Sequence, residues 1–303
     1  MSLTAEIIRL AENSGLARVG ISPPFLDYKY ITFFQQWIDA GFLGTMSWMR
    51  KYYDFQNYQK TYFSWAKSVL VVADNYFQNV EWPTGIPKIA RYAWGKDYHK
   101  VVKQKLAKVS REINLLEPAT VSRIYVDSGP VMQKIFAWQA GLGWVGKNNL
   151  LIVPDLGSYC FIGMIFLNLE LHFNEPQSNL CGDCQLCRDA CPNQALVDEH
   201  LLDARLCTAY LTIEKDSEFS MAEKENLRGW IYGCDTCQKI CPYNQKWKRP
   251  GDTRYSEYYS EFSKSLTDWL KVTEDEFGEI FRDSPIRRIG FANWRRNLLT
   301  LRK

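Results

Sequence analysis

Eight of the nine cysteines in this 303-residue chain lie between positions 181 and 241, where their spacing is typical of iron–sulfur ligands. The first group follows the pattern Cys-x2-Cys-x2-Cys-x3-Cys-Pro and comprises Cys181, Cys184, Cys187 and Cys191. In proteins with two [4Fe–4S] clusters, three cysteines of such a run ligate one cluster and the fourth ligates the other. Pro192 favours an extended backbone at Cys191, which helps the fourth thiolate turn away from the other three.

A second, shorter group repeats the pattern but lacks its first cysteine, because Ile231 occupies that position. Its members are Cys234, Cys237 and Cys241, followed by Pro242. Cys207 lies between the two groups and is the only plausible replacement. Crosswise exchange between the groups then predicts two ligand sets. One set is Cys181, Cys184, Cys187 and Cys241, and the other is Cys191, Cys207, Cys234 and Cys237.

Zinc is the main alternative for these cysteines, because paired Cys-x2-Cys spacings also occur in zinc sites. Zinc would account for four ligands, but it leaves the Cys-Pro ends and the crosswise count unexplained, so we favour two clusters. Cys160 is left over, within Tyr-Cys-Phe-Ile-Gly-Met. We expect it to be a small buried apolar side chain.

The composition indicates a globular protein, with 46% hydrophobic and 23% charged residues. No apolar run is long enough to span a bilayer, and the N-terminus lacks the basic and small-residue features of a signal peptide. We therefore expect a cytoplasmic protein with no membrane partner, in which cysteines serve as metal ligands rather than disulfides. The net charge of +3 does not indicate a nucleic-acid partner. The stretch 286–296, however, is basic with interleaved aromatic residues, which suits a polyanion.

Strands and helices alternate through residue 170, which predicts a layered α/β domain. The apolar run 68–73 is typical of a strand buried on both faces. Other strands are expected at 19–22, 121–126, 150–153 and 161–167, and helices at 4–14, 32–40, 98–115 and 131–140. The lysines of the helix 98–115, at positions 103, 105 and 108, are expected to form a solvated face.

Three regions follow from this pattern: an α/β catalytic domain at 1–175, a ferredoxin-like two-cluster domain at 176–247, and a short helical C-terminal segment at 248–303. An electron carrier needs only the residues around its clusters, so the α/β region argues for a second cofactor or a substrate pocket. The stretch 141–146 is nominally Gly-x-Gly-x-x-Gly. It follows a helix and precedes a strand, which is the wrong context for a dinucleotide site.

At several segments the chain resembles the epoxyqueuosine reductases. These are Arg-Tyr-Ala-Trp-Gly-Lys-Asp-Tyr-His at 91–99, Asp-Ser-Gly-Pro at 127–130, Gly-Leu-Gly-Trp-Val-Gly-Lys-Asn at 141–148, Gly-Ser-Tyr at 157–159, Leu-Thr-Ile-Glu at 211–214 and Gly-Cys-Asp-Thr-Cys-Gln at 233–238, with the cysteine array. The resemblance runs from about residue 5 to the end. It implies two [4Fe–4S] clusters, base-off cobalamin, and reduction of the epoxide of epoxyqueuosine at tRNA position 34 to give queuosine. An external low-potential electron donor and a monomeric enzyme are also expected.

The resemblance also implies roles for individual residues. Asp127 matches the family's proton donor, although on residue type alone an aspartate before Ser-Gly-Pro is more often a turn cap. The implied cobalamin contacts are Gln56, Ala90, Arg91, Asp127, Leu151, Phe161, Thr208, Cys234 and Asp235. Gln56 stands where the family usually has an arginine. His99 is expected to be structural rather than a cobalt ligand.

Two other functions compete with this interpretation. One is a corrinoid reductase of a small molecule, similar to the reductive dehalogenases, and the other is a ferredoxin-like electron carrier. For the tRNA enzyme, the anticodon loop carrying epoxyqueuosine is expected to contact the cluster domain and the basic C-terminal stretch, since proteins read RNA loops through splayed bases.

Overall fold

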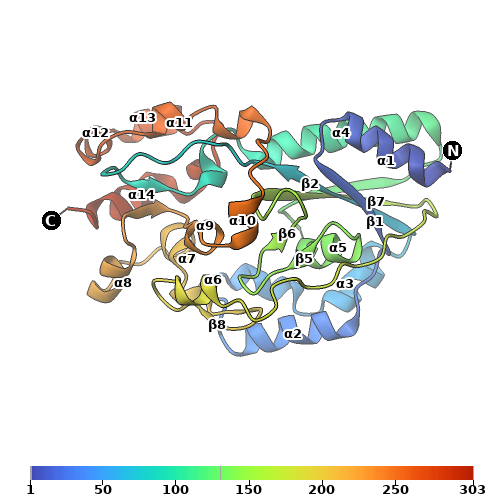
Figure 1. Ribbon diagram of the computed structural model, residues 1–303, viewed down its shortest axis with the longest axis horizontal. Helices are drawn as coiled ribbons and strands as arrows, with labels where there is room; N and C mark the ends of the chain where they lie inside the picture. Colours follow the sequence, from blue (N-terminus) through green and yellow to red (C-terminus); the bar gives the residue numbers. More distant parts are fainter. Residues whose placement is uncertain (1, 130, 303) are drawn as a thin grey trace.

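The computed structural model describes residues 2–129 and 131–302, without the side chains of Phe55, Gln56 and Tyr58. Its centre is an antiparallel four-stranded sheet in the order β1-β2-β7-β4 (Figure 1). The strands are β1 (Arg18–Ser22), β2 (Ser68–Asn75), β7 (Cys160–Leu167) and β4 (Ser122–Val126). Every residue of β2 is buried, which confirms the prediction of a strand covered on both faces.

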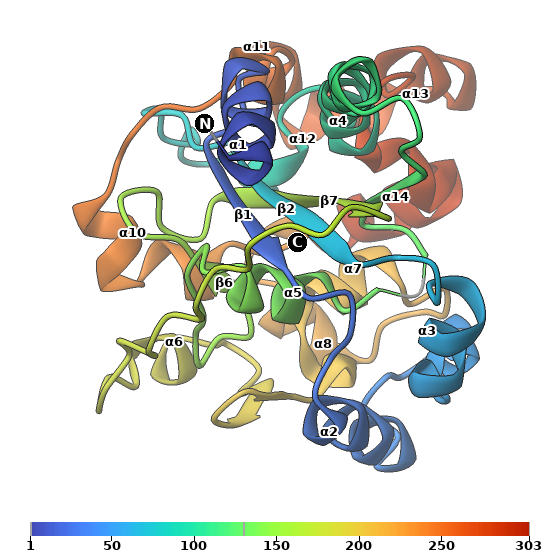
Figure 2. The ribbon, with the colours of Figure 1, turned by 90° about the vertical axis from the view of Figure 1, so that its right-hand side faces the viewer.

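Helices cover both faces of this sheet, as Figure 2 shows. Helices α1 (Leu3–Asn13) and α4 (Tyr98–Leu116) pack on one face, around Ile7, Leu106 and Ile165. On the other face lie α5 (Gln133–Gln139) and residues from α2 (Tyr28–Asp39) and from the segment after α3 (Phe55–Tyr62). The layered α/β architecture is therefore confirmed. Helix α2 begins four residues before its predicted start, because Asp27 caps it by accepting a hydrogen bond from Lys29 N–H.

The predicted strand at 150–153 does not join the main sheet. Instead β6 (Leu151–Ile152) pairs with β5 (Trp144–Val145), inside the glycine-rich stretch. Gly143 allows this close approach, because a Cβ there would lie 2.0 Å from the carbonyl oxygen of Ile152. Two more short pairs are β3 (Lys88–Ile89) with β10 (Trp230–Tyr232), and β8 (Leu196–Asp198) with β9 (Leu201–Leu202).

The cysteine-rich region consists of short helices below the sheet in Figure 1. These are α6 (Leu186–Asp189), α7 (Thr208–Ile213), α8 (Met221–Asn226), α9 (Thr236–Lys239) and α10 (Pro242–Lys246). The C-terminal region is helical, as expected, with α11 (Tyr259–Phe262), α12 (Leu266–Lys271), α13 (Glu274–Ile280) and α14 (Gly290–Leu299). The 3-10 helices are η1 (Ser47–Tyr52), η2 (Arg91–Ala93), η3 (Ala204–Leu206), η4 (Thr253–Ser256) and η5 (Pro285–Ile289).

The C-terminal helices form one hydrophobic core together with residues of the 89–94 and 231–232 segments. Trp269, Phe281 and Trp294 from the C-terminal helices pack with Trp94 and Ile231. The 3-10 helix η2 and strand β10 are thereby held against the end of the chain. Among the residues described, no helix combines the length and the apolar character that crossing a membrane requires.

One lysine of the α4 face is buried, contrary to the expected solvated face. Lys105 Nζ lies 2.7 Å from Asp74 Oδ2 on β2 and 2.9 Å from Asp252 Oδ2, which precedes η4. Burial raises the pKa of Asp74, against the opposing charge of Lys105. Burial also acts to raise the pKa of Asp252, but hydrogen bonds from Arg254 and Lys105 hold it below its usual range. This buried cation therefore connects the α4 layer, the sheet and the C-terminal region.

Replacing Lys105 with methionine should destabilise the protein by about 3–5 kcal/mol, because the buried Asp74 carboxylate would lose its cation. The measurement is urea unfolding of the cluster-loaded protein under anaerobic conditions. Lys108→Met, on the exposed face of the same helix, is the matched control and should change stability by less than about 0.5 kcal/mol. Equal unfolding midpoints for the two variants would contradict the role given to Lys105.

Candidate active site

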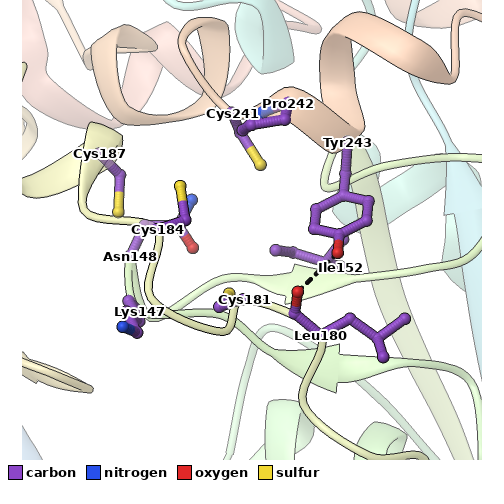
Figure 3. Close-up of a pocket in the computed structure, with 10 residues that line it drawn as sticks. All are labelled: Lys147, Asn148, Ile152, Leu180, Cys181, Cys184, Cys187, Cys241, Pro242 and Tyr243. Carbon is purple, nitrogen blue, oxygen red and sulfur yellow. Dashed lines mark hydrogen bonds between the residues drawn. The ribbon is translucent and has the colours of Figure 1, made fainter.

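Four of the predicted ligand cysteines line one pocket. The thiols of Cys181, Cys184, Cys187 and Cys241 surround a cavity of about 130 Å³, bounded also by Lys147, Asn148, Ile152, Leu180, Pro242 and Tyr243. Figure 3 shows the four side chains around a common space, with Cys241 reaching it from the opposite side to the other three. Cys241 has an extended backbone (φ −63°, ψ 125°) immediately before Pro242 at the start of α10. The proline thus keeps this residue outside the helix, and its thiol lies beside the first cysteine group.

The other four cysteines form a second group of partly buried side chains. Burial raises the pKa of the Cys237 thiol well above its usual value, and charge on Cys234 and Cys207 raises it further. Cys191 lies within the same electrostatic reach. Crowded, partly buried thiols resist ionisation, so positive charge from bound iron is what would favour four thiolates here. This donor set fits an iron–sulfur cluster.

A network of buried amides holds both cysteine groups against the α/β region. Asn244 on α10 accepts a hydrogen bond from Ser158 N–H at 2.6 Å and donates to Ser158 Oγ at 2.9 Å. Gln238 on α9 donates to the carbonyl oxygen of Ser158 at 3.0 Å. Gly157 is required next to them, because its φ is +73° and a Cβ there would lie 2.1 Å from Asn244 Oδ1. The Gly-Ser-Tyr segment therefore fixes the position of the cluster helices.

The expected cobalamin contacts fall into two groups. Ala90 lies against Gly233, where a Cβ would lie 2.6 Å from the Ala90 Cβ, and Ala90 N–H donates to Tyr232 O at 2.8 Å. Thr208 is connected to this group through Thr212, whose hydroxyl accepts from Gly233 N–H at 3.0 Å and donates to the Thr208 carbonyl at 2.8 Å. Leu151 and Phe161 lie elsewhere, in the two cores on opposite faces of the sheet. The side chain of Gln56 lies outside the described part of the structure.

Both the side chain and the backbone of Arg91 form hydrogen bonds to other residues of the chain. Its buried guanidinium donates to the carbonyls of Gln78 and Val80 and stacks on the ring of Trp94, 4.4 Å from the centroid. Its backbone N–H donates to Asp235 Oδ2 at 2.7 Å. Burial raises the pKa of Asp235 to about 6, against the effect of this hydrogen bond. Arg91 and Asp235 thus connect η2 to the second cysteine group.

Asp127 follows β4 directly, with an exposed side chain and a left-handed backbone (φ 43°). Such a backbone is uncommon for a residue other than glycine, and non-glycine examples cluster at functional sites. Its carboxylate accepts a short hydrogen bond from the hydroxyl of Tyr98. Tyr98 is itself fixed by stacking on Phe161, with ring centroids 4.2 Å apart and an interplanar angle of 2°. The carboxylate is therefore oriented by a rigid partner.

An aromatic series that sequence reasoning did not identify connects Asp127 to the cysteines. Tyr92 lies between Tyr98 and Tyr232, with centroid separations of 6.1 Å and 5.9 Å. Tyr232 lies two residues before Cys234. The only sequence signal for this bridge was that Tyr92 and Tyr98 belong to the 91–99 segment.

The basic C-terminal stretch is only partly available to a partner. Arg296 is buried, and its guanidinium donates to the carbonyl oxygens of Lys215 and Ser217, so this arginine of the stretch is occupied within the protein. Arg288 pairs with Glu214 at the edge of a polar pocket of about 240 Å³. Trp48, which is 45% exposed, lines the same pocket.

Two family models match the chain. Residues 180–244 match the 4Fe-4S double cluster binding domain, and residues 57–128 match Epoxyqueuosine reductase QueG, DUF1730. The first match shows that the cysteine-rich region binds [4Fe–4S] clusters, as the cysteine pattern predicted.

Curated relatives match nearly the whole chain. An epoxyqueuosine reductase from Synechocystis is 41% identical over 87% of this chain and 92% of that protein. The enzyme from Atelocyanobacterium thalassa is 34% identical over 98% of both chains.

Solved structures agree with these relatives. An epoxyqueuosine reductase with an epoxyqueuosine-modified tRNA stem loop superimposes with a TM-score of 0.89 at 25% identity, over 98% of this chain and 80% of that chain. The structure from Streptococcus thermophilus gives a TM-score of 0.88 at 27% identity, over 99% of this chain and 80% of that chain. The resemblance predicted from the motifs is thus confirmed, and the chain belongs to the epoxyqueuosine reductase family.

Proposed function

We propose that this protein reduces the epoxide of epoxyqueuosine in tRNA to give queuosine. The observation that carries the proposal is the pairing of two cysteine groups with an exposed, oriented carboxylate, in a chain that matches epoxyqueuosine reductases over 98% of its length. An external low-potential donor would supply the electrons through the clusters. The cysteines would then serve the reductive part of the reaction, and Asp127 the protonation.

The cluster ligands follow from the arrangement of the thiols. We assign Cys181, Cys184, Cys187 and Cys241 to one [4Fe–4S] cluster, because all four line one pocket. Cys191, Cys207, Cys234 and Cys237 are assigned to the other, because the first three lie close enough to Cys237 to raise the pKa of its thiol. Cys160 is left outside both sets, on β7.

Cobalamin in its base-off form is the proposed second cofactor. The segments that would hold it are Ala90-Arg91, Thr208 and Cys234-Asp235, which converge beside the second cysteine group. They fit a cofactor that must receive electrons from a cluster, since Cys234 belongs to both the contact segment and the ligand set. Bound there, cobalamin would supply a metal centre able to transfer two electrons to an epoxide carbon.

Asp127 is the proposed catalytic acid. Breaking an epoxide C–O bond leaves an alkoxide, which needs a proton from a group within hydrogen-bond reach. The Asp127 carboxyl is exposed at the end of β4, and Tyr98 fixes its direction. The polar pocket with Trp48 and Arg288 is the proposed contact for the tRNA loop, since aromatic rings and arginines stack on splayed bases.

The function is tested by incubating anaerobically reconstituted protein, loaded with iron and cobalamin, with a reductant and an epoxyqueuosine-containing tRNA stem loop. Digestion and nucleoside analysis should show queuosine. Complete loading without any queuosine would contradict the proposal.

Asp127→Asn should retain cobalamin and iron but lose turnover by about 10²–10⁴-fold, the usual contribution of a general acid. Asparagine also tolerates a left-handed backbone, so the loop should keep its shape. Asp155→Asn is the matched control, because Asp155 is another exposed aspartate with positive φ (65°). The rate of queuosine formation is the measurement, and an unchanged rate in Asp127→Asn would remove Asp127 from the acid role.

Cys207→Ser should lower the iron content from about eight to about four atoms per chain, because one of two [4Fe–4S] clusters loses a thiolate. Cys160→Ser should leave the iron content unchanged. Iron analysis and the visible absorbance of anaerobically purified protein measure both variants. Full iron content in Cys207→Ser would show that the ligand assignment is wrong.

A further inference from the structure

A second ionisable pair lies behind Asp127 and has no role in the function proposed above. Asp97 caps α4 by accepting a hydrogen bond from the backbone N–H of His99 at 3.0 Å. The same carboxylate lies 2.8 Å from His99 Nδ1. On the other side of the ring, His99 Nε2 lies 3.8 Å from Asp127 Oδ2. The imidazole of His99 therefore stands between two carboxylates, which the expectation of a purely structural histidine did not anticipate.

The stoichiometry of the proposed reaction requires more than one proton. Removing an epoxide oxygen as water, and leaving a carbon–carbon double bond, consumes two electrons and two protons. The first C–O bond breaks to leave an alkoxide, which takes one proton. The second C–O bond then breaks, and the hydroxyl group leaves as water with the second proton. Both electrons arrive through the clusters, whereas a single carboxyl group carries only one proton.

We propose that His99, held by Asp97, stores the second proton and delivers it through Asp127. This inference rests on the proposed function, and it assigns His99 and Asp97 as positioning residues rather than catalytic ones. In each turnover Asp127 gives its proton to the alkoxide, receives the proton of His99 Nε2, and gives that proton to the departing hydroxyl group. His99 then regains a proton from solvent, to which its side chain is 37% exposed.

The geometry supports a transfer in this direction. A separation of 3.8 Å is closed by a shift of about 1 Å or by one bridging water. The interaction of Nδ1 with Asp97 directs Nε2 toward Asp127, as carboxylates commonly orient catalytic imidazoles. Tyr98 is not the proton store, because burial and the charge of Asp127 raise its pKa far above the usual value. Its hydroxyl therefore remains a donor that orients Asp127.

The charges around His99 favour its protonated form. Burial alone would lower the pKa of His99, but the hydrogen bond and charge of Asp97, with the charge of Asp127, raise it above its usual value. The other charged groups facing the pair are Arg288 of η5, Lys100 of α4 with its partner Asp283, and Lys134 of α5. Arg288 opposes the increase.

The first test is the pH dependence of queuosine formation over multiple turnovers. Wild-type turnover should fall as pH rises through the raised pKa of His99, because the stored proton is then lost. Asp97→Asn should move this fall to lower pH, since a negative charge beside the ring is removed. Asparagine caps a helix as well as aspartate does, so α4 should remain intact. His99→Gln should lose this pH-dependent step and slow turnover near neutral pH by about 10–100-fold, a smaller loss than that of the acid itself.

The second test does not depend on turnover. The chain contains three histidines, so isotope-labelled histidine NMR of the cluster-loaded, cobalamin-free protein resolves each titration. The signal of His99, identified by its absence in His99→Gln, should titrate above the usual range in the wild type and at lower pH in Asp97→Asn. His172→Gln is the matched control, because the exposed His172 forms its hydrogen bond through the backbone. It should leave the pH profile unchanged.

The outcomes separate this inference from the proposed function. Absence of queuosine with the loaded wild-type protein counts against the function itself. Normal product formation with the same pH profile in wild type, Asp97→Asn and His99→Gln would overturn the proton store and leave the function intact. A His99 titration that does not move in Asp97→Asn would overturn it as well.

Discussion

The structure depends on burying the cluster-binding helices against the edge of the α/β region through a few amide hydrogen bonds. Asn244 and Gln238 lie on either side of Cys241, and both are hydrogen-bonded to Ser158. All three side chains are nearly inaccessible to solvent. A single buried hydrogen bond contributes about 1 kcal/mol, but an unsatisfied one costs about 1–3 kcal/mol. Losing one partner would therefore leave the other buried polar groups unsatisfied. The intact network fixes the position of Cys241, which lies between Gln238 and Asn244.

The same organisation brings the proposed catalytic acid and the proposed cluster ligands toward one region. Strand β4 ends one residue before Asp127, α4 begins at Tyr98, and β10 ends two residues before Cys234. Three tyrosine rings connect these ends, from Tyr98 through Tyr92 to Tyr232. The central sheet and the C-terminal core position both sides of this bridge. The proposed active site is therefore formed where β4, α4 and β10 meet, and not within a single layer of the fold.

The sequence predicted the parts whose signal is local. The β-branched run of β2 and the periodic pattern of α4 require only neighbouring residues, as does the spacing of each cysteine group. The burial of Lys105 was not predictable, because its partners Asp74 and Asp252 lie 31 and 147 positions away. Likewise, Asp97 and His99 are two positions apart in sequence, whereas Asp127 meets them only because β4 packs beside α4. Short strand pairs such as β3 with β10 were not predictable either, because two or three residues are too few to show the alternation typical of a strand.

The crossing of the two cysteine groups has a consequence for how the protein matures. Cys237 and Cys241 are four residues apart on one continuous segment, yet they face different thiol groups. Neither iron site is complete until residues 181–191 and 234–241 have come together. Insertion of either metal centre would thus require the two segments to have met, which couples cluster assembly to the folding of this part of the chain.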